Sequence, residues 1–338
     1  MKHTWNWAVA VTGLGALMPA MAQAQVELKV SSFVPQNDAL MQIVETWAND
    51  LTERSGGEIS FAYFPSSQMG PPDRQFDLAR TGVADIVLTI HGFTPGRFPM
   101  TEVAYMPGLF DGVPTERGAG ILWDMYEPYL KAEHEDTRLL AITPTSQAFI
   151  LSQAPYPDLE TLSGQRIRSA GTAMSDTLQA LGAVPVAVPS PEMADALQRG
   201  LVDGLGITYQ STADWQIEGI GTDIWGVNIG VVSFGLMMNE ARYQSLTPKQ
   251  QALIDETTGE VMSLAFGRHI DEAETEAKER IGTNFTVTTP DAENMAAIEA
   301  ALAQRIEAGL QALEDRDRPA RALYEDIQNA ASAARAGN

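Results

Sequence analysis

Hydrophobic and polar residues alternate along segment 26–33 (VELKVSSF), a period of two that predicts a half-buried strand. Segment 39–54 carries Leu, Ile, Val and Trp at helical spacing and is followed by Ser-Gly-Gly, a typical helix stop. Further strands are predicted over 58–64 and 86–90, with a helical stretch between them. Strands that alternate with helices indicate a parallel α/β sheet.

Segment 164–204 fits a strand, a helix, a strand, a helix and a third strand into about forty residues. Near its end, 197–203 (LQRGLVD) is similar to 78–85 (LARTGVAD). Each string consists of a helix end, a glycine stop, a short turn and an aspartate before a strand. Either this likeness is chance, or the two similar units indicate two similar α/β lobes.

Two arginines flank an isoleucine in the strand that opens this segment, as Arg166-Ile167-Arg168. If Ile167 faces the core, both arginines face away from it. Either both are solvated, or one lies in a cleft at the carboxyl end of the strand, where open α/β sheets bind ligands. Loop 91–99 (HGFTPGRFP) follows the apolar strand 86–90 and has the same kind of position.

The C-terminal third is predicted to be helical. Thr247-Pro248-Lys249-Gln250 is a capping box with proline at the first helical position, and it predicts one long helix to about residue 281. A short strand over 285–288, a second long helix to about 314 and a last helix after Pro319 follow. Residues 331–338 are expected to fray.

Charge and composition narrow the function. The 338 residues include 22 basic and 44 acidic ones, a formal charge of −22. This balance argues against binding to nucleic acid or to anionic lipid. A small anionic ligand would meet a repulsive field and would need its own fixed cation. No cysteine is present, so disulfides, thiol nucleophiles and cysteine metal sites are excluded.

Signatures of catalysis are missing. The sequence contains no phosphate loop, no complete dinucleotide fingerprint and no nucleophile elbow. The four histidines are scattered without metal-ligand spacing. We therefore expect no metal and no cofactor, and an enzyme has little support.

Residues 1–24 have the pattern of a secretory signal. A short positive start precedes an apolar run, and Ala22-Gln23-Ala24 is a small-x-small cleavage site. The run is too short for a membrane span. We expect cleavage after Ala24 and export to the periplasm, with a retained anchor as the alternative.

Several short strings are spread in order along nearly the whole mature chain. They are 55–58 (SGGE), 64–70 (FPSSQMG), 78–85, 94–99 (TPGRFP), 164–168, 181–186 (LGAVPV), 196–204 and 238–239. Each string is weak alone, but their order and spacing together are specific. They resemble the strings of the solute-binding subunit of tripartite ATP-independent periplasmic (TRAP) transporters, of the dicarboxylate-binding type.

The resemblance implies a periplasmic-binding-protein-like fold of type II, with two α/β lobes, a cleft between them and long C-terminal helices. It places residues 25–145 and 233–272 in lobe I, and 146–232 and 273–330 in lobe II. It also implies that Arg168 of R-I-R-S-A pairs with the ligand carboxylate, because the family has an arginine at this place. A guanidinium holds a carboxylate through two parallel hydrogen bonds and stays charged when buried.

The chain departs from the sialic-acid-binding members of the family. Their second arginine is missing from segment 147–150, and the asparagine after their V-D-G string is missing from 205–209. This favours a smaller or more apolar acid: a keto acid, an aromatic acid or a monocarboxylate. A dicarboxylate also stays open as the ligand. The aromatic candidates also suit a core role, and Arg97 also suits a structural role in its loop. The further ligand-contact candidates are Phe33, His91, Phe93, Arg97, Phe149, Ser169, Gly171, Ser190, Tyr209 and Phe234.

The resemblance therefore predicts capture of a small organic anion and its delivery to TRAP membrane permease subunits by a monomeric protein. Two alternatives stay open: a ligand-binding sensor subunit that uses the same fold and arginine, and an exported enzyme. A neighbouring gene for a sensor kinase, or turnover of a bound ligand, would distinguish them.

Overall fold

The predicted N-terminal strands form part of a five-stranded sheet. The computed structural model describes residues 25–336, so the predicted signal peptide lies outside the described residues. The strand order is β2-β1-β3-β10-β4, in which β1 pairs in parallel with β2 and β3, and β10 runs antiparallel to β3 and β4. The strands are β1 (Val26–Ser32), β2 (Ile59–Phe64), β3 (Ile86–Ile90), β4 (Thr137–Pro144) and β10 (Ser233–Asn239).

Segment 164–204 contributes to a second sheet, of six strands in the order β11-β9-β5-β8-β6-β7. Strand β6 pairs in parallel with β7 and β8, whereas β5 is antiparallel to β8 and β9. The strands are β5 (Phe149–Ser152), β6 (Arg166–Ser169), β7 (Val184–Ala187), β8 (Gly204–Ile207), β9 (Asp223–Trp225) and β11 (Thr286–Thr288).

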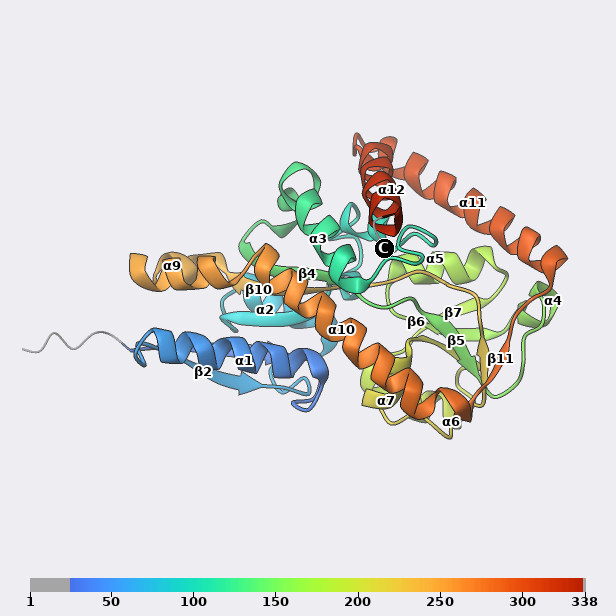
Figure 1. Ribbon diagram of the computed structural model, residues 1–338, viewed down its shortest axis with the longest axis horizontal. Helices are drawn as coiled ribbons and strands as arrows, with labels where there is room; N and C mark the ends of the chain where they lie inside the picture. The colour runs from blue at the N-terminus through green and yellow to red at the C-terminus, as the bar shows by residue number, and fades with distance from the viewer. Residues whose placement is uncertain (1–24, 337–338) are drawn as a thin grey trace, which may run out of the picture.

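The chain passes between the sheets from β4 to β5, and it returns from β9 to β10. Figure 1 shows two lobes side by side, with helix α10 running diagonally across both. The predicted fold of two α/β lobes with long C-terminal helices is therefore confirmed.

Helices cover both sheets (Figure 1). From the N-terminus they are α1 (Ala39–Arg54), η1 (Pro72–Arg74), α2 (Gln75–Arg80), η2 (His91–Phe93), η3 (Thr101–Tyr105), α3 (Thr115–Met125), η4 (Tyr126–Leu130) and η5 (Lys131–His134). Lobe II contains α4 (Leu159–Leu162), α5 (Thr172–Ala180), η6 (Ser190–Glu192), α6 (Met193–Gln198) and α7 (Tyr209–Asp214). The C-terminal helices are α8 (Glu240–Gln244), α9 (Pro248–Thr257), α10 (Glu260–Ile281), η7 (Gly282–Asn284), α11 (Ala292–Glu314) and α12 (Ala320–Ala336).

Two predicted helix limits are wrong. The capping box at Thr247 forms, but its helix ends at Thr257, and α10 starts only after Gly259. Gly259 has φ of 73°, and a Cβ there would lie 2.9 Å from the ring of Trp123, so the chain breaks the helix where only glycine fits. Helix α12 continues to Ala336 instead of fraying from residue 331, because Ala331 is fully buried.

The two similar strings make equivalent contacts in the two lobes. Asp85 accepts a hydrogen bond of 2.8 Å from the backbone N–H of Lys29 and pairs with Arg242. Asp203 accepts one of 2.8 Å from the backbone N–H of Arg166 and also pairs with that arginine's side chain. Each aspartate thus ties the start of its strand to a neighbouring strand.

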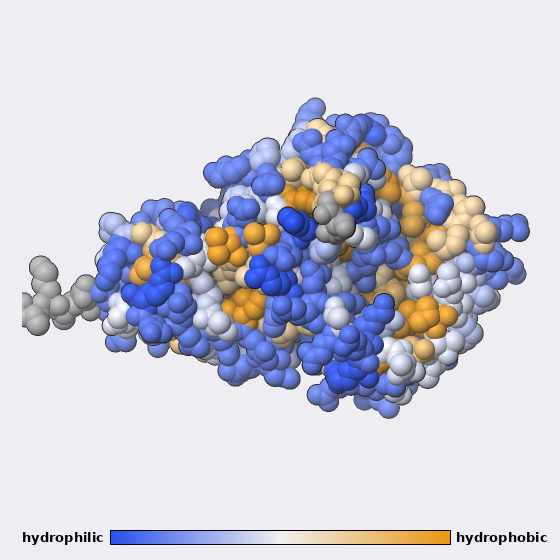
Figure 2. Space-filling view, viewed as in Figure 1, coloured by the Kyte–Doolittle hydropathy of each residue, from blue (hydrophilic) through white to orange (hydrophobic). Residues whose placement is uncertain are grey.

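Hydrophilic residues cover most of the face in Figure 2, and apolar residues form separate patches. Within residues 25–336, no helix is long and apolar enough to cross a membrane.

Candidate functional site

A cavity of about 60 Å³ lies between the lobes, and both lobes contribute to its wall. Lobe I supplies the loop that follows β1, the start of α1 and strand β10. Lobe II supplies β6, β8 and α7. Its lining includes Phe33, Asp38, Leu40, Ile90, Ala148, Arg168, Met174, Ser190, Met193, Gly206, Gln210, Asp214, Trp215 and Phe234.

Arg168 is held rigidly in this wall. Its neighbour Ile167 is fully buried on the opposite side of β6, as the alternation predicted, and Arg168 itself is only 3% exposed. Its Nε donates to the carbonyl of Val188 (3.1 Å) and its Nη1 to that of Gly206 (3.0 Å). Its Nη2 donates to Oγ of Ser190 (3.2 Å). Three of the five guanidinium protons are thereby used, and two are left for a ligand.

The charge of Arg168 has no protein counter-ion. No acidic side chain within residues 25–336 forms an ion pair with it, and burial alone lowers its pKa to about 10. At neutral pH the group is still a cation. A buried, uncompensated cation costs several kcal/mol, which an anion placed beside it would offset.

Arg166 has a different environment from Arg168. Its side chain is 45% exposed and donates to Asp203 from Nη2 (2.7 Å) and Nε (3.0 Å). That carboxylate raises the pKa of Arg166. Arg166 is thus a paired surface residue, and it does not line the cavity.

Three further candidates lie in the cavity with Arg168: Phe33, Ser190 and Phe234. The rings of Phe33 and Phe234 are nearly parallel, with centroids 6.2 Å apart. Ser190 holds the guanidinium. Ser190 is therefore a polar contact of the cation Arg168, and Phe33 and Phe234 form aromatic walls of the same cavity.

Three other candidates, Phe93, Ser169 and Gly171, line a neighbouring apolar cavity of about 510 Å³. Gly171 begins α5, and a Cβ on it would lie 3.0 Å from the backbone of Gly92. The lobes thus touch backbone to backbone at Gly92 and Gly171.

Phe149 and Tyr209 do not share a cavity with Arg168. Their rings contact each other with centroids 4.8 Å apart and line a third cavity, of about 680 Å³, beneath α11. Lys278 lies over the ring of Tyr209. The alternation of β5 turns Phe149 towards the smaller core cluster of lobe II instead of towards the cleft.

His91 belongs to the core of lobe I. It is fully buried, with Nδ1 2.8 Å from Oγ of Ser233 and Nε2 3.1 Å from Nε2 of His134. Burial lowers its pKa to about 3. This ring therefore packs inside lobe I and does not line the cavity.

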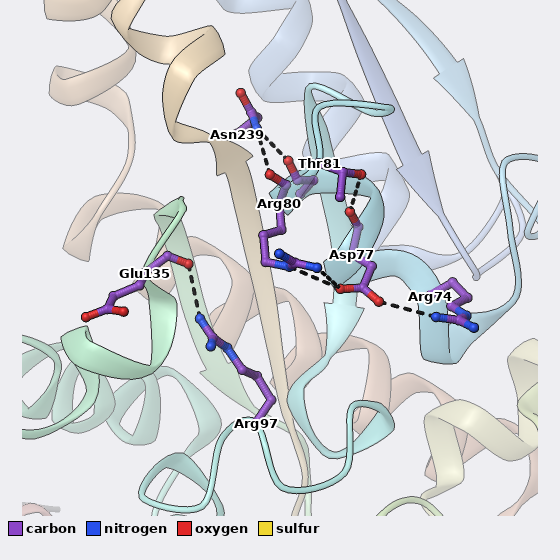
Figure 3. A network of polar contacts seen from close by, with 8 residues as sticks. Arg74, Asp77, Arg80, Thr81, Arg97, Glu135 and Asn239 are labelled. Carbon is purple, nitrogen blue, oxygen red and sulfur yellow. Dashed lines mark hydrogen bonds and ion pairs between the residues drawn. The ribbon is translucent and has the colours of Figure 1, made fainter.

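Arg97 has a structural environment too. Its guanidinium lies 5.0 Å from the ring centre of Phe76. Its Nη2 donates to the backbone carbonyl of Glu135 (3.1 Å; Figure 3). In the same view Asp77 joins Arg74 and Arg80 on the surface of lobe I. Arg97 braces its loop and lines none of the three cavities.

Sequence reasoning missed two acidic residues of the cavity, Asp38 and Asp214. The sequence pattern marks Asp38 only as part of a turn and helix start. An aspartate before a helix has the same sequence pattern whether or not its carboxylate faces a cavity, so the pattern does not identify a ligand contact. In residues 25–336 no group of three or more His, Cys, Asp or Glu side chains is placed to hold a metal.

A sequence profile of the bacterial extracellular solute-binding proteins, family 7, matches residues 30–310. The chain belongs to this family. The outer membrane transporter protein TsaT of Comamonas testosteroni is 25% identical over 280 residues, 80% of this chain and 81% of TsaT. The ectoine-binding periplasmic protein TeaA of Halomonas elongata is 25% identical over 203 residues, 56% of this chain and 57% of TeaA.

Solved structures agree with this assignment. A TRAP solute-binding protein from a marine metagenome, described as specific for aromatic acid ligands, has a TM-score of 0.85 and 25% identity over 91% of this chain and 98% of its own. It was crystallised with 3-hydroxybenzoate. A TRAP solute-binding protein of Rhodoferax ferrireducens with copurified benzoate matches with the same values. The predicted TRAP solute-binding type, which works with membrane permease subunits, is confirmed.

Proposed function

We propose that this family 7 protein captures a small organic acid anion between its lobes, with Arg168 pairing to the carboxylate. The observation that carries the proposal is a guanidinium that is only 3% exposed, faces the cavity and lacks an acidic partner within residues 25–336. Exclusion of water around the pair strengthens its attraction, because the local dielectric constant falls. Capture needs no catalytic group, and we assign none.

We further propose that the ligand is an aromatic or similarly apolar acid. The wall around Arg168 includes Phe33, Phe234 and Trp215, together with Met174 and Met193. Such a wall suits a ring or an alkyl body better than a chain of hydroxyl groups. The marine metagenome and Rhodoferax proteins, which bind aromatic acids, support this choice.

The proposal includes location and delivery. Residues 1–24 direct export and are removed after Ala24, so the mature protein works in the periplasm. The closed, ligand-bound form then hands the anion to the permease subunits. We expect the protein to act as a monomer.

Calorimetry with 3-hydroxybenzoate and benzoate tests the role of Arg168. Arg168→Ala is expected to weaken binding at least about thirtyfold, because loss of a desolvated charge partner costs roughly 2–5 kcal/mol. Arg168→Lys is expected not to restore it, since an ammonium lacks the planar fork. Arg166→Ala, two residues away, is the matched control and should bind like the wild type. An unchanged dissociation constant for Arg168→Ala would overturn the assignment.

A further inference from the structure

Two carboxyl groups face the cavity of Arg168 from opposite lobes. Asp38 caps the N-terminus of α1 in lobe I, and Asp214 ends α7 in lobe II. Asp38 is 5% exposed, and its Oδ1 accepts a hydrogen bond of 2.9 Å from the N–H of Leu40. These two carboxyl groups therefore approach each other across the contact between the lobes.

Both groups lie where a negative charge is poorly solvated. Burial raises the pKa of Asp38 to about 7, and the nearby carboxylate of Asp214 contributes to that rise. Burial likewise raises the pKa of Asp214 to about 6, while Gln210 and Arg280 oppose the shift by smaller amounts. Hydrogen-bond donors brought to these carboxyl groups would stabilise them.

The cavity contains groups of opposite charge that do not pair with each other. Within residues 25–336, neither Asp38 nor Asp214 forms an ion pair with Arg168, whose guanidinium donates to Val188, Gly206 and Ser190. The two carboxyl groups therefore leave Arg168 free to hold the carboxylate of a ligand. The buried, uncompensated Arg168 independently marks this cavity as a ligand site.

We propose that Asp38 and Asp214 select organic acids that carry a hydrogen-bond donor, a hydroxyl or an amino group, in addition to the carboxylate. This inference rests on the proposed function, because it assumes that Arg168 holds the carboxylate. The donor would reach both lobes at once, so the same contact that recognises the ligand would also hold the cleft closed.

The physical reason is the gain of a hydrogen bond to a charged group. An unsubstituted acid would occupy the apolar wall but bring no donor to the two carboxyl groups, which would keep only their present partners, the N–H of Leu40 for Asp38 and the side chain of Gln210 for Asp214. Sites built around buried polar groups discriminate strongly against analogues that lack the matching donor. We expect about tenfold or greater preference for the donor-bearing acid.

Calorimetry on two matched pairs tests this: benzoate with 3-hydroxybenzoate, and phenylacetate with 3-hydroxyphenylacetate. The wild type is expected to bind the hydroxylated member of at least one pair about tenfold more tightly. Asp38→Ser, which keeps a capping hydroxyl for α1, and Asp214→Ala should each bring that ratio close to one. Asp73→Ala, an exposed acid at the neighbouring apolar cavity, removes the same charge and should leave the ratio unchanged.

The outcomes separate the two proposals. Equal affinities within both pairs, or ratios that survive both cavity substitutions, would overturn the selection by Asp38 and Asp214 alone. Binding of the pairs that is insensitive to Arg168→Ala would overturn the proposed function instead. If the wild type binds none of the four acids, the aromatic assignment and this inference both fail. Melting temperatures of the ligand-free variants check that each is folded.

Discussion

Side chains of the same type differ in their environment and charge partners in this protein, because they differ in burial. Arg166 and Arg168 are two positions apart on β6, yet the first pairs with Asp203 at the surface and the second faces the cavity. Among the histidines, His91 and His134 form a buried pair in lobe I. The backbone carbonyl of Leu130 accepts from Nδ1 of His134. Burial lowers the pKa of both rings well below 7, which keeps them neutral at pH 7, so Nε2 of His134 accepts from Nε2 of His91.

This neutral pair predicts loss of stability in acid. Burial lowers the pKa of His91 to about 3 and of His134 to about 4, against about 6.5 in an unfolded chain. As the pH falls below about 6.5, the two histidines become protonated in the unfolded chain but stay neutral in the folded protein, so the free energy of unfolding decreases. Between pH 7 and 5, urea unfolding of the wild type should lose about 2 kcal/mol more than that of His134→Gln. Equal losses would contradict the assignment.

At the scale of elements, α10 joins the lobes by capping one helix in each. Its Asp271 accepts from the N–H groups of Thr115 (2.8 Å) and Glu116 (3.0 Å) at the start of α3 in lobe I. Its Glu274 accepts from those of Tyr209 (3.2 Å) and Gln210 (2.7 Å) at the start of α7 in lobe II. A carboxylate at a helix N-terminus satisfies free donors and suits the helix dipole.

The two caps should differ in their effect on binding. Glu274→Ala and Asp271→Ala are each expected to lower stability by about 1 kcal/mol. Glu274→Ala should also weaken 3-hydroxybenzoate binding several-fold, because α7 carries Gln210 and Asp214 into the cavity. Asp271→Ala should bind normally, because α3, the helix that Asp271 caps, lines no part of that cavity. Thermal unfolding and calorimetry on both variants measure this, and parallel behaviour in binding would refute it.

At the scale of the whole molecule, closure of the cleft depends on how closely the two lobes can approach each other. Their backbones meet at Gly92 after β3 and Gly171 at the start of α5. Gly171 has φ of 108°, a conformation that L side chains rarely adopt, and a Cβ there would lie 3.0 Å from Cα and O of Gly92. Small residues at this contact let the lobes close over Arg168.

Gly171→Ala should therefore hinder closure. Clash and backbone strain of roughly 1–3 kcal/mol would reduce 3-hydroxybenzoate affinity about tenfold. Small-angle X-ray scattering should then show a larger radius of gyration at saturating ligand than for the wild type. Gly200→Ala is the control, since Gly200 also has a positive φ (67°) but a Cβ there would have no atom within 4 Å. A Gly171→Ala variant that binds and closes normally would argue against the contact.

The sequence by itself determined the elements and the two lobes, because strand and helix periods, glycine stops and caps act locally. Through resemblance it also selected Arg168. The sequence pattern wrongly predicted one helix across Gly259, where the structure has two. It also placed Phe149 and Tyr209 beside Arg168, whereas the structure places them in another cavity. Which side chains share a cavity depends on how the lobes meet. Asp38 and Asp214 are 176 positions apart in the chain, so only the tertiary structure could bring both of them into the cavity of Arg168.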